Sequence, residues 1–361
     1  MKQMKVKLED VCERGTSNLK QSDIAKTSGD YPIYGASGYI GNTNFYHQEK
    51  PYVAIVKDGA GVGRAALYPA NSSVIGTMQY LLPKDNVLPK YLFYVVSYMH
   101  LEKYYTGATI PHIYFKDYKN EEFNLDLLER QAEIVEILEK CEKIIEKRKQ
   151  EIQLLDQLIK ARFVEMFGNP VLNDKGWEQK SLGEITTKIG SGATPKGGKE
   201  AYQEEGITLI RSMNVHNGQF EYKDLAHISD EQASKLDNVT IEEDDVLLNI
   251  TGASVARSCV VPNEILPARV NQHVCIIRCK DCIIPEFLNK LLIDDNYQDL
   301  LWSIAGSGAT RESITKQQVE NLQIILPMLE LQKEFMAFCH QVTKSKLFEF
   351  SSLQNHTGML Q

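Results

Sequence analysis

Two arginines stand at equivalent places in a repeated motif and carry side chains suited to reading DNA. Arg64 follows the segment Gly59-Ala60-Gly61-Val62-Gly63, and Arg257 follows Gly252-Ala253-Ser254-Val255-Ala256, 193 residues later. A guanidinium is planar and donates two parallel hydrogen bonds, so it matches the edge of a guanine or a phosphate. The alternative interpretation is that both arginines are solvated side chains of tight turns.

A second repeated motif, Gly-Ala-Thr, is also followed by side chains that could contact DNA. Such groups, held on a loop, are of the kind that reads base edges, and Gly107 and Gly308 would permit the turn. The candidates are Thr109 and His112 in the first copy, and Thr310 and Arg311 in the second. Further candidates, each weaker, are Lys57, Lys196, Arg211 and Asn214.

The motifs that would place a catalytic centre in this chain are missing. Residues 57–63 look superficially like a phosphate loop, but Arg64 stands where a dinucleotide fingerprint needs its third glycine, and no Gly-Lys-Ser/Thr follows. The Asn/Asp-Pro-Pro-Tyr motif of amino-methyltransferases is absent, and Asn169-Pro170-Val171 does not supply it. We therefore expect no catalytic residues and no bound cofactor in this chain.

The seven cysteines predict neither disulfides nor a metal site. Their odd number and wide scatter do not form a disulfide framework, which points to a reducing cytoplasm. Cys275, Cys279 and Cys282 are close in sequence, with Cys259 nearby, but zinc sites use ligands in paired short spacings. The favoured interpretation is that they are small apolar residues of a strand.

The elements that hold these loops occur twice. Residues 106–134 match residues 307–335 at ten of 29 positions without a gap. Strand-like runs cover 52–56, 245–250 and 273–277, and a helix opened by Pro89 or Pro285 follows in each copy. A period of about 200 residues is too long for a solenoid. We therefore expect a duplicated domain of mixed α and β structure.

A long helix is predicted after each domain. Residues 127–167 contain no Pro or Gly, which at about 1.5 Å per residue gives a rod of about 60 Å. Its apolar seven-residue repeat favours a coiled-coil seam; the positions are Leu138, Ile145, Ile152, Ile159 and Met166, with Cys141 and Leu155 at the second position, which Arg148 and Arg162 interrupt. A second helix begins near Met328 and favours an antiparallel pair. The alternative is a plain linker helix.

Composition and charge limit the function further. The chain has 361 residues, 43% of them hydrophobic and 24% charged, which suits two soluble domains. It has no apolar run long enough to span a membrane and no signal-peptide pattern. The net charge is −8, and residues 1–125 carry +2 while residues 169–326 carry −8. A chain that binds DNA with so little positive charge needs partners to neutralise phosphates.

The order of these parts resembles the specificity subunit of type I restriction-modification systems. The resemblance rests on the two Gly-Ala-Thr loops that lead to Leu128-Glu129-Arg130-Gln131 and Leu329-Glu330-Leu331-Gln332. It also rests on Phe163–Pro170 at the helix end, on Gly190–Pro195, and on Tyr31–Gly38. One departure is Asp126, which stands where the second copy has Pro327.

The resemblance implies an α+β protein with two target-recognition domains, separated by long helices that pair as an antiparallel coiled coil. The expected boundaries are 1–125 and 169–326 for the domains, and 126–168 and 327–361 for the helices. It implies double-stranded DNA as ligand, with a bipartite asymmetric target. Two methyltransferase subunits and restriction–translocase subunits would be partners and would bring S-adenosylmethionine, ATP and Mg²⁺. Two alternatives stay open: a coiled-coil scaffold whose flanking domains bind protein, and a self-contained methyltransferase.

Overall fold

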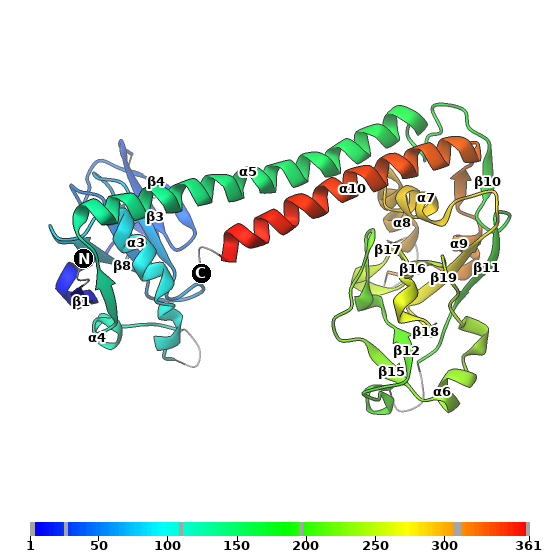
Figure 1. The fold of residues 1–361 in the computed structure, drawn as a ribbon, viewed down its shortest axis with the longest axis horizontal. Helices are drawn as coiled ribbons and strands as arrows, with labels where there is room; N and C mark the ends of the chain where they lie inside the picture. Colours follow the sequence, from blue (N-terminus) through cyan, green and yellow to red (C-terminus); the bar gives the residue numbers. More distant parts are fainter. Residues whose placement is uncertain (1–3, 25–27, 108–110, 195–197, 307–311, 359–361) are drawn as a thin grey trace. The chain divides into compact units, whose positions relative to one another are not determined.

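The computed structural model describes residues 4–24, 28–107, 111–194, 198–306 and 312–358. These residues divide into two compact units. The first unit comprises residues up to 149 together with the helical residues 352–358, and the second comprises residues 150–351. Figure 1 shows that each unit combines sheets and helices.

An antiparallel four-stranded sheet, in the order β2-β8-β5-β6, forms the centre of the first unit. Along β5 (Tyr52–Val56), Val53 and Ile55 pack toward helix α3 (Pro89–Tyr98), whereas Tyr52, Ala54 and Val56 pack on the opposite face. Because successive side chains of a strand point to opposite faces and both faces are covered, every position of β5 is apolar. The other strands are β2 (Cys12–Thr16), β8 (Met78–Pro83) and β6 (Ala65–Tyr68).

Smaller elements complete the first unit. A three-stranded sheet, β4-β3-β7, has one antiparallel and one parallel pairing, and β1 pairs antiparallel with β9. Their bounds are β1 (Met4–Lys7), β3 (Tyr31–Gly35), β4 (Gly38–Thr43), β7 (Ser73–Val74) and β9 (Glu122–Leu125). The short helices are α1 (Leu8–Val11), α2 (Gln21–Ile24), the 3-10 turn at Leu101–Tyr104 and α4 (Phe115–Tyr118).

The second unit repeats this topology and adds one antiparallel pair, β13 (Val215–His216) and β14 (Gln219–Phe220). Its four-stranded sheet has the order β11-β19-β16-β17 and its three-stranded sheet the order β15-β12-β18, with the same senses of pairing. β10 pairs with β20 as β1 pairs with β9. The bounds are β10 (Gln179–Ser181), β11 (Thr186–Ser191), β12 (Ile207–Ile210), β15 (Ala226–Ile228), β16 (Val246–Asn249), β17 (Ser258–Val260), β18 (Ala268–Val270), β19 (Val274–Cys279) and β20 (Gln323–Ile325). The predicted duplication and the α+β class are confirmed.

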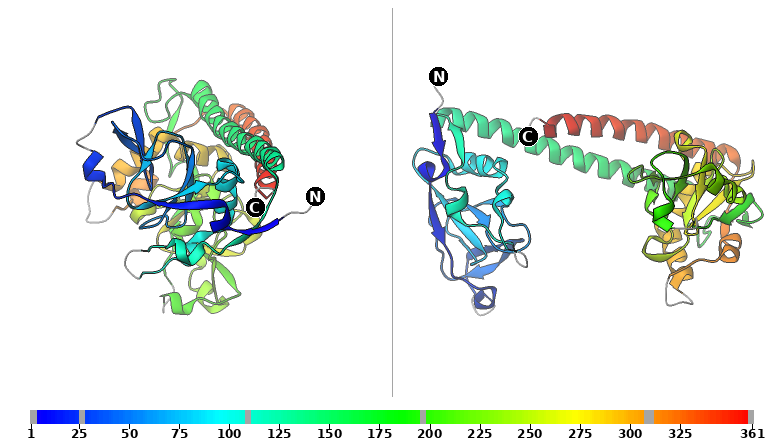
Figure 2. Two further views of the ribbon diagram at one scale, coloured as in Figure 1. Left: turned by 90° about the vertical axis from the view of Figure 1, so that its left-hand side faces the viewer. Right: turned by 90° about the horizontal axis from the view of Figure 1, so that it is seen from below.

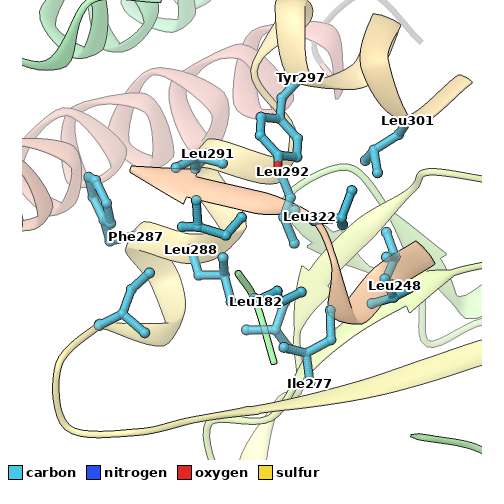
Figure 3. Packing of buried hydrophobic residues seen from close by; sticks show 14 of the residues in the cluster. Leu182, Leu248, Ile277, Phe287, Leu288, Leu291, Leu292, Tyr297, Leu301 and Leu322 are labelled. Carbon is cyan, nitrogen blue, oxygen red and sulfur yellow. The ribbon is translucent and has the colours of Figure 1, made fainter. Parts of the chain in front are cut away.

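Helices cover one face of the second unit's central sheet. Figure 3 shows Leu248 and Ile277 of the sheet packed with Phe287, Leu288 and other apolar side chains of the helices. The helices and remaining strands are α6 (Asp230–Ser234), α7 (Pro285–Leu292), α8 (Asp295–Gly306), α9 (Lys316–Glu320), β13 (Val215–His216) and β14 (Gln219–Phe220). The proline-led helices expected at Pro89 and Pro285 are therefore α3 and α7.

Two long helices, α5 (Leu128–Phe167) and α10 (Leu329–Gly358), occupy the places that the sequence predicts. Within the second unit they run antiparallel (Figures 1 and 2): Arg162 bonds to Glu334 at 2.9 Å, and Asp156 to Lys346 at 2.5 Å. The predicted seam residues Ile159 and Met166 pack against the hydrophobic core of the second unit. The buried stripe of α5 also includes Phe163 and Phe167, outside the heptad, because this end of the helix contacts α7 as well.

Candidate nucleic-acid interface

In each unit, the first repeated loop motif is bonded to the residues that follow the second motif. In the first unit, the backbone N–H of Gly59 donates to Pro111 O at 2.9 Å, and Ile113 N–H donates to Lys57 O at 2.9 Å. The second unit makes the equivalent bonds, from Gly252 N–H to Glu312 O at 2.9 Å and from Ile314 N–H to Ile250 O at 2.8 Å. Segments about 50 to 60 residues apart are thus joined by main-chain hydrogen bonds, and we call each joined edge a loop pair.

The first loop of each pair is closed by the same backbone hydrogen bond in both units and ends in a left-handed residue. Gly63 N–H and Ala256 N–H each donate back across the turn, to Val56 O at 2.8 Å and to Asn249 O at 2.9 Å. Gly63 has φ +87° and Ala256 has φ +71°, both in the left-handed region. A residue without a side chain adopts this region freely, so alanine at 256 keeps the turn at an energetic cost.

The arginines that follow these turns differ in their surroundings. Arg64 is exposed, and its guanidinium donates to the carbonyl of Ala36. Arg257 is half-buried, and its side chain forms no hydrogen bond or ion pair with any residue that the structure describes. Both side chains leave donors for a ligand, since a guanidinium carries five N–H groups.

Two further candidates lie in the first loop pair. Lys57 precedes the turn and its Nζ is 3.7 Å from Asp58, a distance that marks a weak ion pair. His112 forms a bridge with Asp58 and exchanges backbone bonds with Thr106, each at 2.9 Å. Lys57, Arg64 and His112 are therefore brought to one edge of the first unit.

Arg211 and Asn214 lie elsewhere, in the turn after β12. The guanidinium of Arg211 donates to Asp224 O and lies 5.4 Å from the ring centroid of Tyr202. Asn214 is fully buried, and its amide nitrogen donates to Glu221 O and Lys223 O. Its amide oxygen accepts from Arg211 N–H at 3.1 Å. Asn214 thus shapes its turn and exposes no group to a ligand.

Four candidates lie outside the residues that the structure describes. They are Thr109, Lys196, Thr310 and Arg311.

Sequence reasoning missed polar and aromatic side chains beside the loop pairs. In the first unit, Tyr114 and Tyr105 are 50% and 60% exposed on either side of the second loop. In the second unit, the hydroxyl of Thr251 hydrogen-bonds to Nδ1 of His273, and Thr194 bonds to Gln272. The identities shared by the two copies do not reveal these residues, because most of them differ between the copies.

The cysteines behave as apolar residues. All seven are free thiols. Burial raises the pKa of Cys12, Cys259, Cys275 and Cys279 to about 12, so these thiols stay protonated. Within the described part of the chain, no group of three or more His, Cys, Asp or Glu side chains could hold a metal ion.

Comparison with known proteins gives one family. The model for the type I restriction modification DNA specificity domain matches residues 1–155 and 174–350. The MjaIX specificity subunit of a type I restriction enzyme from Methanocaldococcus jannaschii is 25% identical over 278 residues, which are 71% of this chain and 62% of that protein. The putative MjaX specificity subunit of the same organism is 22% identical over 338 residues, 88% of this chain and 72% of that protein.

Solved structures show the same fold. The crystal structure of a type I restriction-modification S subunit from M. genitalium aligns with a TM-score of 0.61 at 15% identity, over 99% of this chain and 94% of that one. A chain from a study of complex assembly and conformational transition of the type I system aligns with a TM-score of 0.61 at 17% identity, over 99% of this chain and 95% of that one. None of the described helices combines the length and apolar character that a membrane crossing requires. With two family matches that together cover most of its length, the chain belongs to the family of type I restriction-modification DNA specificity domains.

Proposed function

We propose that this chain is the DNA-recognition subunit of a type I restriction-modification complex and that each of its units reads one half of a bipartite target. The observation that carries the proposal is the loop pair, which occurs in both units with the same main-chain bonds and different side chains. A shared scaffold with unlike side chains suits two different half-sites and an asymmetric target, because base edges are read by side-chain donors and acceptors.

The proposed interface consists of the loop pairs, the side chains next to them, and two further cations of the second unit, Lys196 and Arg211. Its members in the first unit are Lys57, Arg64, Thr109 and His112. In the second unit they are Lys196, Arg211, Arg257, Thr310 and Arg311. The proposed domains are residues 1–125 and 169–326, joined by the helical segments 126–168 and 327–361.

Partner chains complete the proposed complex. A net charge of −8 leaves this chain few cations to neutralise phosphates, which dominate affinity for DNA. Two methyltransferase subunits would supply that charge and the methyl-transfer chemistry, and restriction–translocase subunits would join them in the cytoplasm. S-adenosylmethionine, ATP and Mg²⁺ would be held by those partners. The isolated chain should therefore bind DNA poorly and gain sequence-specific binding with its methyltransferase subunits.

The long helix α5 supports an unread spacer between the half-sites. It runs from Leu128 to Phe167 and so passes from the first unit into the second as one helix. Two recognition units joined by a helix meet DNA at a fixed helical phase. Inserting four residues at Gln150-Glu151 should lengthen the spacer and leave both half-sites unchanged. An alanine replacement of the same two residues, with no change in length, is the control.

A domain exchange tests whether each unit reads one half-site. Residues 1–125 are replaced by the same segment of a related subunit, and the methylated sites of the resulting strain are sequenced. We expect one half-site to change and the other to persist. If both half-sites changed, or neither did, the assignment of one half-site to each unit would be wrong. Specific binding by the chain without partners at physiological salt would contradict the proposed dependence on methyltransferase subunits.

A further inference from the structure

The first unit carries an aromatic and basic strip that the second unit lacks. His112, Tyr114 and Lys116 alternate along the chain after the second loop, and we call them the strip. Their counterparts at the constant offset of 201 residues are Ser313, Thr315 and Gln317. The backbone around them is the same: Ile113 and Ile314 are 1% and 2% exposed, and a short helix follows in both units, α4 in one and α9 in the other.

At the central position of the strip, Tyr114 or Thr315, the two units differ in helix capping. Thr315 is the N-cap residue of α9, and its hydroxyl accepts from Gln318 N–H at 3.2 Å. The Gln318 side chain accepts in return from Thr315 N–H at 2.8 Å, which completes a capping box. Tyr114 is the N-cap residue of α4 and makes no such side-chain bond. The first unit therefore forgoes a stabilising cap and presents a tyrosine that is 50% exposed.

The strip is ordered by contacts among its own members. The rings of His112 and Tyr114 meet edge to face with centroids 4.9 Å apart. Lys116 Nζ lies 5.3 Å from the centroid of the Tyr114 ring. Together with Tyr105, which is 60% exposed, Tyr114 and Lys116 line a hollow beside the loop pair.

Charge favours an anionic ligand in this hollow. Lys103, at its edge, is paired with Glu121 at 2.6 Å. Lys116 is exposed and forms no ion pair with any residue that the structure describes, so its charge is available to a ligand. Asp117 also lines the hollow, and its carboxylate offsets part of the positive charge there. Exposed rings beside a free cation, adjoining a loop that bears candidate base contacts, match the combination that binds nucleic acid.

We propose that the strip is a DNA-binding element of the first unit alone: the Tyr114 ring packs against a base or sugar at the edge of the half-site, and Lys116 contacts a phosphate. The inference rests on the proposed function and names a contact surface beyond the loop pairs. The second unit, with Ser313, Thr315 and Gln317, makes no equivalent contact. Recognition of the two half-sites therefore differs in extent as well as in sequence.

Substitution by the counterpart residues of the second unit tests the strip. Tyr114→Thr installs the capping residue of α9, so we expect the fold to be kept and the melting temperature to be no lower than that of the unaltered chain. In the complex with methyltransferase subunits, Tyr114→Thr should weaken binding to the target about tenfold, because a base–aromatic contact is lost. Lys116→Gln should weaken binding to all sequences and reduce the slope of log affinity against log salt by about one. Tyr98→Thr, at the exposed C-terminal end of α3, is the matched control and should bind as the unaltered chain does.

The outcomes separate this inference from the proposed function. If the unaltered complex fails to prefer its target over scrambled DNA, the proposed function fails. If it prefers its target and both Tyr114→Thr and Lys116→Gln bind DNA unchanged, the strip is not a DNA-binding element. If Tyr114→Thr lowers the association of methyltransferase subunits and leaves DNA affinity per assembled complex unchanged, the strip contacts protein and the inference is overturned.

Discussion

Gln131 and Gln332, 201 residues apart, make the same three hydrogen bonds in the two units. Each side chain is fully buried in the first turn of its long helix. Its oxygen accepts from the backbone N–H that precedes the proline opening α3 or α7, and its nitrogen donates to two backbone carbonyls. The partners, at 2.8 to 3.2 Å, are Leu88, Asn86 and Asp126 in the first unit and Ile284, Cys282 and Pro327 in the second. Each glutamine therefore fixes the start of a long helix to the domain that precedes it.

Replacing Gln332 by leucine should destabilise the second unit. The substitution leaves one backbone N–H and two carbonyls buried without their partner, and we expect a loss of about 3 kcal/mol in the free energy of unfolding. Urea unfolding measures the loss. Gln341→Leu, at an exposed position of the same helix, is the control and should change stability by less than about 0.5 kcal/mol. Equal effects of the two substitutions would contradict the structural role of Gln332.

Opposite substitutions at Ala256 and Gly63 should have opposite effects. Ala256→Gly removes the Cβ of a residue that lies in the left-handed region and should stabilise the second unit by about 1 kcal/mol. Gly63→Ala adds a Cβ that would lie 2.4 Å from the backbone nitrogen of Glu102, in addition to the strain of φ +87°. We expect it to destabilise the first unit by more than about 2 kcal/mol. Thermal unfolding of both variants checks the prediction, which a stabilising Gly63→Ala would refute.

Arg257→Ala should relax specificity at one base pair. If the guanidinium donates two hydrogen bonds to a guanine, its loss weakens binding by about 1–3 kcal/mol, and only for DNA that carries this guanine. Arg257→Lys should not restore the preference, because an ammonium lacks the planar pair of donors. For comparison, Lys196→Ala should weaken binding to all sequences alike and lower the salt slope by about one. The measurement is binding to a panel of single-base variants of the target, and a uniform loss from Arg257→Ala would place this arginine on a phosphate instead.

Thiol labelling should follow burial. Cys12, Cys259, Cys275 and Cys279 have pKa values raised to about 12, so at pH 8 almost none of each is thiolate, the reactive form. We expect a maleimide to label the half-buried Cys141 and Cys282 first. Labelling of the four protonated thiols should rise with pH, and all seven should react in denaturant. Rapid labelling of Cys275 in the native chain at pH 8 would contradict its position in the core.

Much of the scaffold could be predicted because the duplication exposes it. Identities between the copies mark residues that both units need for folding, such as Ile113 and Ile314 in the core and Gln131 and Gln332 at the helix starts. The heptads indicated the helix pair but not Phe163, since its burial depends on contact with α7, far along the chain.

The candidate site could be predicted only in part, for the same reason. Residues that differ between the two units, such as Tyr114 and Thr315, do not stand out when the two copies are aligned to find identical residues. Asn214 is a polar residue that the sequence offers as a DNA contact, yet its amide nitrogen donates to backbone carbonyls of the following turn. Hydrogen bonds of that kind depend on tertiary geometry, which residue types alone do not specify.

The loop pairs are joined through main-chain atoms, and this has an evolutionary consequence. The bonds from Gly59 to Pro111 and from Gly252 to Glu312 use only backbone N–H and C=O groups, which every residue except proline can supply in full. The side chains on these loops are therefore not needed to join the two loops. Under the proposed function, mutation or recombination can exchange the side chains away from the left-handed positions Gly63 and Ala256 with little loss of stability, so a lineage can acquire a new recognition sequence without first having to repair the fold.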